Sequence, residues 1–140
     1  MSIGMTMPPR QTNGWRQRAR TKIVVIFALL LARLPPRRLK VLLGWAAARA
    51  RPAGYRQTER YYHAVTAASL SCAGWQGCLP RSIAVALLCQ LEGTWPTWCV
   101  GVRATPPFAA HAWLEADGRI VAELGKPDAY RALIRVEAGP

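Results

Sequence analysis

The stretch GCLPRSIAVALLC, Gly77 to Cys89, places a cysteine just ahead of a proline and then continues as an apolar helical pattern. Proline is tolerated in the first turn of a helix, where its missing N–H would have no partner anyway. We therefore expect Cys78 at or just before a helix N-terminus. Unpaired N–H groups and the positive end of the helix dipole favour a thiolate there. Cys78 is thus a candidate nucleophile, and its own backbone N–H is a candidate oxyanion donor.

A cysteine nucleophile needs a base within hydrogen-bond reach, and that base needs an orienting partner. His111 is the one histidine after residue 63, and it lies in a predicted strand that follows the break at residues 106–107. A cysteine at a helix start that faces a histidine on a strand is the arrangement of papain-like and transglutaminase-like enzymes. The alternative is that Cys78 is a small core residue and His111 an ordinary strand residue.

The residue that orients His111 should be an acid that follows it, and the candidates are Glu115, Asp117 and Glu123. Asp117 precedes a glycine, a pair typical of a tight hairpin turn, so a turn role competes with catalysis there. Glu115 shares a strand face with His111 and is a weaker alternative. Glu123, on the return strand of the hairpin, is the preferred candidate.

The assignment of Glu123 carries a geometric condition. A two-residue turn would pair Glu123 with Ala112 and turn it away from His111, whereas a three-residue loop with a glycine bulge would pair it with Trp113. A role for Glu123 therefore predicts a bulge or a longer loop in this hairpin.

The remaining polar and sulfur-bearing residues give weaker signals. Gln76 is a candidate side-chain donor to an oxyanion, with an ordinary loop role as its alternative. Cys89 and Cys99 are expected in the core, and Cys72 in a loop, with its exposure left open. No two cysteines form a CxxC pair, so neither a metal site nor a cofactor is expected. Without a convincing secretion signal, we expect reduced thiols.

The elements that must position Cys78 and His111 follow from periodicity and breakers. Helices are predicted at about 15–34, 37–51, 57–70 and 79–91, and strands at 98–103, on both sides of the Asp117–Gly118 turn, and at 133–136. Helices followed by antiparallel strands indicate an α+β fold. We expect a mobile tail at 1–14, a basic helical region at 15–70, and a core at 71–140 in which the cysteine helix packs on a small antiparallel sheet.

The charge is divided unevenly along the chain. The formal net charge is +12, and residues 1–63 carry 13 of the 19 Lys and Arg residues and a single acid, Glu59. Neither zinc-finger spacing nor dense interleaving of aromatic and basic residues is present, so nucleic acid is not an expected partner. The apolar run Ile23–Ala32 is too short to span a bilayer. A helix packed on the domain is expected, and contact with a membrane surface stays open.

The strings CLPRSIAVALL and TWCVGVRATPPFAAHAWLEADGRIVAE, with the basic helices before them, resemble the leader peptidases of lasso-peptide biosynthesis. These B proteins are cysteine proteases with a transglutaminase-like fold. The resemblance places Cys78 on the family's nucleophile and His111 on its histidine. Glu123 falls where family members commonly carry aspartate, so the chain departs from the pattern there.

The resemblance implies hydrolysis of the bond between leader and core in a ribosomally made precursor peptide. An ATP-dependent lasso cyclase would then close the core. Family members either carry a β-rich leader-recognition domain or use a separate small protein, and the helical pattern of residues 1–70 predicts the second form. The expected location is cytoplasmic, with contact to the inner face of the membrane as an open possibility.

Two rival functions remain at this point. An acyl or amide transferase on the same fold would use the same Cys78 and His111 but pass the acyl group to an amine instead of water. A non-enzymatic adaptor would use the basic helices to bind a membrane or a partner, with Cys78 inert.

Overall fold

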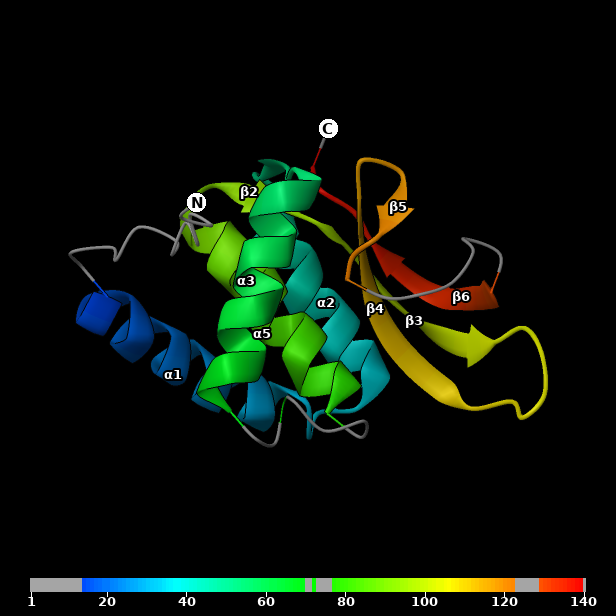
Figure 1. Ribbon diagram of the computed structural model, residues 1–140. Coiled ribbons are helices and arrows are strands. Elements are labelled where there is room, and N and C mark those ends of the chain that lie inside the picture. Colours follow the sequence, from blue (N-terminus) through cyan, green and yellow to red (C-terminus); the bar gives the residue numbers. More distant parts are fainter. Residues whose placement is uncertain (1–13, 70–71, 73–76, 123–128, 140) are drawn as a thin grey trace, which may run out of the picture.

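The computed structural model describes residues 14–69, 72, 77–122 and 129–139. Within this part of the chain, a group of helices packs against one face of a curved antiparallel sheet (Figure 1). This arrangement confirms the predicted α+β fold with a cysteine helix on a small sheet. The tail predicted for residues 1–14 lies outside the described residues, apart from Gly14.

The helices are α1 (Gly14–Leu31), α2 (Pro36–Ala47), α3 (Tyr55–Ala68) and α5 (Cys78–Leu91). Each lies within a few residues of its predicted range. Pro36 takes the first position of α2, where the fixed φ of proline suits a helix and its missing N–H costs nothing. No helix in the described ranges combines the length and the apolar character needed to cross a membrane.

The sheet consists of β3 (Thr97–Arg103), β4 (Ala110–Ala116), β5 (Arg119–Ile120) and β6 (Tyr130–Val136), in the order β5-β4-β3-β6. All neighbouring strands are antiparallel. The pairing of β3 with β6 shifts register between Val100 and Gly101, which marks an irregularity in the ladder. The hairpin between β4 and β5 turns at Asp117–Gly118, as predicted.

A short parallel pair was not foreseen. β1 (Arg51–Pro52) pairs with β2 (Thr94–Trp95), and the backbone N–H of Arg51 donates to the carbonyl of Gly93 at 3.0 Å. A two-residue strand that contains a proline has no periodic pattern, so the sequence indicated only a break there.

Helix α5 lies at the centre of the molecule. It is apolar on nearly every side, which is the pattern of a helix surrounded by protein. It packs against α1 and α3 on one side and against the sheet on the other. Trp98 of β3 donates its indole N–H to Ser82 of α5 at 3.0 Å, which fixes the helix against the sheet.

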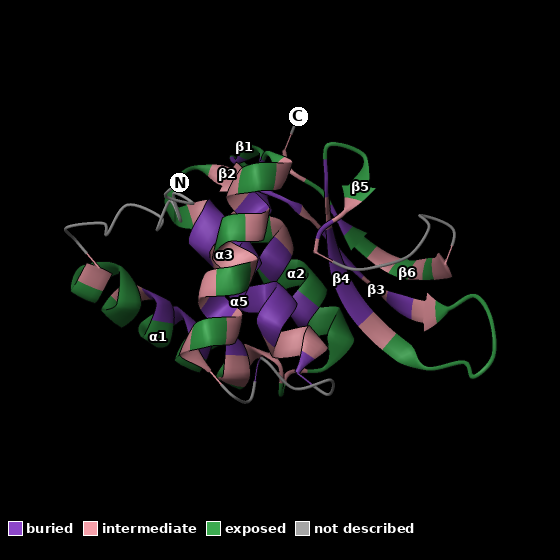
Figure 2. Cartoon of the chain, viewed as in Figure 1, coloured by how far each residue is buried: buried purple, intermediate pink, exposed green. Residues whose placement is uncertain are grey.

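One hydrophobic cluster joins the four described helices to the sheet. It contains Val25 of α1, Leu43 of α2, Val65 of α3, Ile83 of α5 and Leu114 of β4. The buried positions, purple in Figure 2, gather between the helices and the sheet. The basic helical region and the segment after residue 71 therefore share one core.

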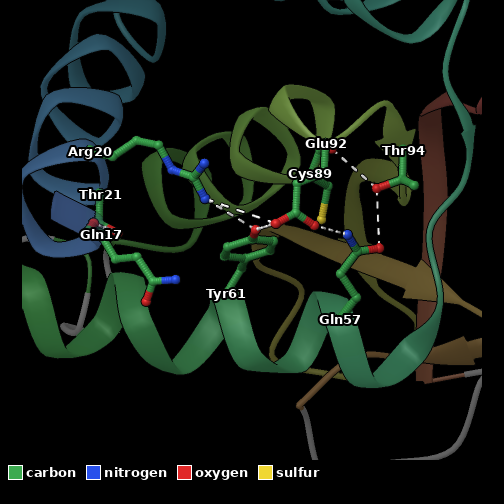
Figure 3. Close-up of polar contacts among 8 residues, drawn as sticks. All are labelled: Gln17, Arg20, Thr21, Gln57, Tyr61, Cys89, Glu92 and Thr94. Atoms are coloured by element: carbon green, nitrogen blue, oxygen red, sulfur yellow. Dashed lines mark hydrogen bonds and ion pairs between the residues drawn. The ribbon is translucent and has the colours of Figure 1, made fainter. Parts of the chain in front are cut away.

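A polar cluster ties α1 to the rest of the fold (Figure 3). Arg20 of α1 donates to the Tyr61 hydroxyl at 3.2 Å, and Tyr61 donates to the carboxylate of Glu92, just after α5. Gln57 donates to the other oxygen of Glu92. These bonds place α1 and α3 in a fixed position on the C-terminal end of α5.

Candidate active site

The first turn of α5 presents Cys78. Gly77 is the N-cap residue, and the first helical bond runs from the N–H of Arg81 to the carbonyl of Gly77 at 2.9 Å. The N–H of Cys78 comes before this bond, so it has no partner within the helix. The helix begins at Cys78, which confirms the predicted position of this residue at a helix start, and the side chain is half-buried.

The edge of β4 that faces away from β3 lies beside Cys78. His111 pairs with Gly101, and the Arg103 N–H donates to Ala109, so the odd-numbered residues of β4 bond toward β3. The N–H of Ala112 therefore points to the opposite edge. Along that edge the N–H of Val121 donates to the carbonyl of Leu114. The N–H of Ala112 lies beyond that bond and donates to the sulfur of Cys78.

The environment of Cys78 favours the thiolate. A hydrogen bond from His111 is the largest influence that lowers the pKa of Cys78 below its ordinary value, and burial opposes it in part. The Ala112 N–H and the positive charge of Arg81 lower the pKa further. Arg81 is buried and donates to the carbonyl of Cys72 at 3.0 Å, so its charge is held close to the helix start.

Two aromatic rings hold the imidazole of His111. The Tyr130 ring stacks on it with centroids 4.8 Å apart, and Trp113 lies 6.0 Å away at an interplanar angle of 13°. Tyr130 reaches His111 from β6 across β3, where Gly101 has no side chain to block it. Sequence reasoning missed Tyr130, because its place opposite His111 depends on strand order.

Two of the predicted acids have partners away from His111. The carboxylate of Asp117 accepts the N–H of Tyr55 at 2.8 Å, so Asp117 caps the start of α3 from the hairpin turn. Glu115 accepts from Arg135 at 2.7 Å and from the Trp113 indole at 3.3 Å. Glu123 and Gln76 lie outside the described residues.

The turn between β4 and β5 is shorter than the loop that a catalytic role for Glu123 would require. Asp117 and Gly118 both have positive φ, 53° and 72°, and Ala116 pairs with Arg119, so the turn has two residues. The predicted three-residue loop is therefore wrong, because an Asp-Gly pair satisfies the tight turn unaided. Ala122, which follows β5, has a φ of 58°, and its N–H donates to the Tyr55 hydroxyl at 3.3 Å.

The other cysteines differ from Cys78. Cys89 and Cys99 are fully buried, as predicted, and burial raises the pKa of each to about 12. Cys72, whose exposure the sequence left open, is also fully buried. Burial raises its pKa as well. In the described ranges, Cys78 is thus the one cysteine whose pKa is lowered.

Comparison with known proteins identifies the family. The family model of the transglutaminase-like superfamily matches residues 22–135, which is most of the chain. No curated protein and no solved structure matches significantly. The match covers α1, α2 and α3 as well as the elements that carry Cys78 and His111. The chain therefore belongs to the transglutaminase-like superfamily.

Proposed function

We propose that this protein is a cysteine peptidase that removes the leader from a ribosomally made lasso-peptide precursor. The observation that carries the proposal is the contact between Cys78 and His111, which lowers the pKa of a thiol at a helix start. The strings around Cys78 and His111 resemble lasso leader peptidases, and this resemblance selects the substrate class within the superfamily.

In the first half of the reaction, the Cys78 thiolate attacks the carbonyl carbon of the last leader residue. The backbone N–H of Cys78 lies at the helix start, where it can donate to the developing oxyanion. Protonated His111 then gives its proton to the leaving amine as the carbon–nitrogen bond breaks. The products are a thioester between leader and enzyme and a core peptide with a new amino terminus.

In the second half, neutral His111 removes a proton from water, which attacks the thioester carbonyl. The carbon–sulfur bond breaks, the leader leaves as a carboxylic acid, and Cys78 returns as a thiolate beside protonated His111. The ring of Tyr130 on His111 limits the rotation of the imidazole between the two halves.

We further propose that the peptidase works with a separate leader-recognition protein and hands the core to an ATP-dependent cyclase. Residues 14–69 form α1, α2 and α3, with only two residues of strand, which is unlike the β-rich recognition module of the fused family members. The helices of residues 14–69 therefore do not themselves supply a recognition module of that kind.

Mass spectrometry of a precursor peptide incubated with the protein tests the proposal, with and without the recognition protein. We expect one cut at the leader–core junction, accelerated by the recognition protein and abolished by Cys78→Ala. Cys89→Ala is the matched control, because Cys89 lies on the same helix with a raised pKa. It should retain cleavage.

A primary amine added to the reaction separates hydrolysis from acyl transfer. Release of the leader as a free acid, even with excess amine, supports the peptidase. A leader amide as the main product would assign the site to a transferase. No cleavage by folded protein in any combination would overturn the proposal and favour an adaptor role.

A further inference from the structure

A stripe of apolar side chains on α1 is exposed although α1 belongs to the core. Its members, spaced three and four residues apart, are Ile23, Ile26, Phe27 and Leu30, each more than half exposed. Val24, Val25 and Ala28, on the opposite side of the same turns, are buried. From Ile23 to Leu30 the helix is thus apolar on both sides but covered by the protein on one side only, and an exposed apolar stripe of this kind indicates a binding surface.

The exposed apolar surface continues beyond the stripe. Ile23 and Phe27 also line an apolar groove of about 640 Å³ between α1 and Leu87 and Leu91 near the end of α5. Trp15, 70% exposed, lies at the N-terminal end of this groove. Figure 2 shows exposed positions, in green, along much of α1.

Cations surround the stripe, and carboxylates are missing from this part of the sequence. Exposed Arg16, Arg18 and Lys22 precede the stripe along the helix, and Arg33, Arg37 and Arg38 follow it. The sequence contains no Asp or Glu from residue 14 to residue 58. A partner for this surface must therefore combine apolar material with negative charge.

We propose that α1 binds the surface of a bilayer that contains anionic lipids, with the stripe inserted at the level of the headgroups. Interfacial helices use this combination of apolar side chains, a tryptophan and flanking Lys and Arg. A fluid anionic membrane can bind any positively charged surface, whatever the exact positions of its charges. A protein interface usually contains charges of both signs and specific hydrogen bonds. The exposed charges around the stripe are positive, apart from Glu92 at the end of the groove, which is already tied to Arg20 and Tyr61, and this excess of positive charge favours lipid.

The bound orientation leaves the active site accessible. Helix α5 runs from Cys78 to Leu91, so the groove end lies roughly 20 Å from the nucleophile along the helix axis. The tie from Arg20 through Tyr61 to Glu92 holds α1 in place on the body. Membrane binding would thus position the peptidase at the membrane without a conformational change at Cys78.

Sedimentation of the full chain with vesicles tests the inference. The probes are vesicles of phosphatidylcholine alone and of phosphatidylcholine with about one third phosphatidylglycerol. We expect binding to the second only, weakened at high salt because screening shortens the reach of the cations. Phe27→Ser should weaken vesicle binding by about tenfold or more. Inserting a phenylalanine side chain into the bilayer should increase the partition coefficient of the protein by at least that factor.

The chain offers a matched control, since it contains two phenylalanines. Phe108, in the loop before β4, is 70% exposed, and Phe27 is 59% exposed. Phe108→Ser should bind vesicles like the original protein. An unchanged rate of Cys78 alkylation in both variants establishes that each is folded.

Three results would overturn the inference. The first is equal binding to both kinds of vesicle or to neither. The second is equal loss of binding in Phe27→Ser and Phe108→Ser. The third is a Phe27→Ser protein that still binds vesicles but no longer responds to the recognition protein, which would assign the stripe to a protein contact.

Discussion

The charge state of Cys78 depends on groups that reach it from β4. His111 and the Ala112 N–H both donate to the sulfur, so the thiolate should persist at a lower pH than in an ordinary thiol. We expect Cys78 to be the cysteine that iodoacetamide alkylates fastest at neutral pH, with a rate midpoint below the ordinary value of about 8.5. Alkylation rates at a series of pH values, followed by peptide mapping, measure this midpoint.

His111→Gln provides the comparison for this prediction. The glutamine cannot carry a positive charge, so the midpoint of Cys78 alkylation should rise toward the ordinary thiol value. An identical midpoint in the two proteins would mean that His111 does not set the charge state of Cys78.

Tyr130 is a positioning residue for His111. An aromatic face beside a cation is worth about 0.5–2 kcal/mol, which corresponds to a pKa change of up to roughly one and a half units. Tyr130→Leu should therefore destabilise the imidazolium and raise the alkylation midpoint of Cys78, whereas Tyr130→Phe keeps the ring and should not. Equal midpoints in the two variants would exclude a role for the stacked ring.

The residues of the site were foreseeable to different degrees. Cys78 was predictable because a proline in the following turn marks a helix start, and His111 because a lone histidine on a strand is a natural base. Tyr130 and Tyr55 were not, since their places follow from strand order and from contacts between residues far apart in sequence.

The β4–β5 hairpin is fixed to α3 by its turn. Asp117 accepts the Tyr55 N–H, and Arg119 lies 4.0 Å from the centre of the Tyr55 ring. Asp117→Ala removes the cap and places alanine at positive φ, so the free energy of unfolding should fall by about 2 kcal/mol. Asn accepts the same bond and tolerates positive φ, so Asp117→Asn should change stability by less than about 0.5 kcal/mol.

The Asn variant also separates a turn role from a catalytic role. If Asp117 oriented His111, loss of its charge would raise the alkylation midpoint of Cys78. The structure leads us to expect an unchanged midpoint, and urea denaturation of both variants measures their stability.

Gly101 allows β6 to shift register beside β3. A Cβ at this position would lie 1.9 Å from the carbonyl oxygen of Arg131 and 2.9 Å from the Cα of Ala132. Both are backbone atoms that cannot rotate away, so Gly101→Ala should destabilise the fold by about 1–3 kcal/mol. Thermal unfolding measures the change.

Gly44 is the matched control for this glycine. It lies inside α2, and a Cβ there would meet nothing within 4 Å. Gly44→Ala should stabilise the protein by about 0.5–1 kcal/mol, because alanine favours a helix. Effects of the same sign at both positions would contradict the proposed role of Gly101.

The sequence indicated most elements but not the irregularities within them. Helix and strand ranges follow from local periodicity, which is why α3 and β3 lie close to their predicted positions. The N–H of Ala122, just after β5, donates to the hydroxyl of Tyr55, 67 residues away in sequence. No local pattern contains that contact. The longer loop, by contrast, was expected from a role for Glu123, against the local Asp-Gly pair that forms the two-residue turn.

At the scale of the whole molecule, the division of charge at about residue 63 does not correspond to two cores. Cations lie on the exposed faces of α1 and α2, whereas their buried faces contribute Val25 and Leu43 to the same cluster as Ile83. The count of charged residues along the sequence reflects the exposed faces of these helices and says nothing about their buried faces. The pattern of burial was therefore needed to see that the basic helices complete the core around α5.

Buried thiols in this shared core should make the fold sensitive to alkali. Burial raises the pKa of Cys89 and Cys99 to about 12. The unfolded chain releases these protons near the ordinary thiol value, so between about pH 9 and pH 12 it holds fewer protons than the native state. Stability must then fall as pH rises, by up to about 1.4 kcal/mol per pH unit for each thiol.

Two cysteine variants separate this effect from other causes of alkaline unfolding. Cys99→Ala removes one raised pKa, so its urea midpoint should decline less steeply with pH than that of the original protein. Cys78 has a lowered pKa, and its ionised form stabilises the fold above the unfolded pKa, so Cys78→Ala should not make the decline shallower. Parallel curves for the original protein and Cys99→Ala would show that Cys99 ionises in the native state, and hence that β3 opens to solvent well before the molecule unfolds.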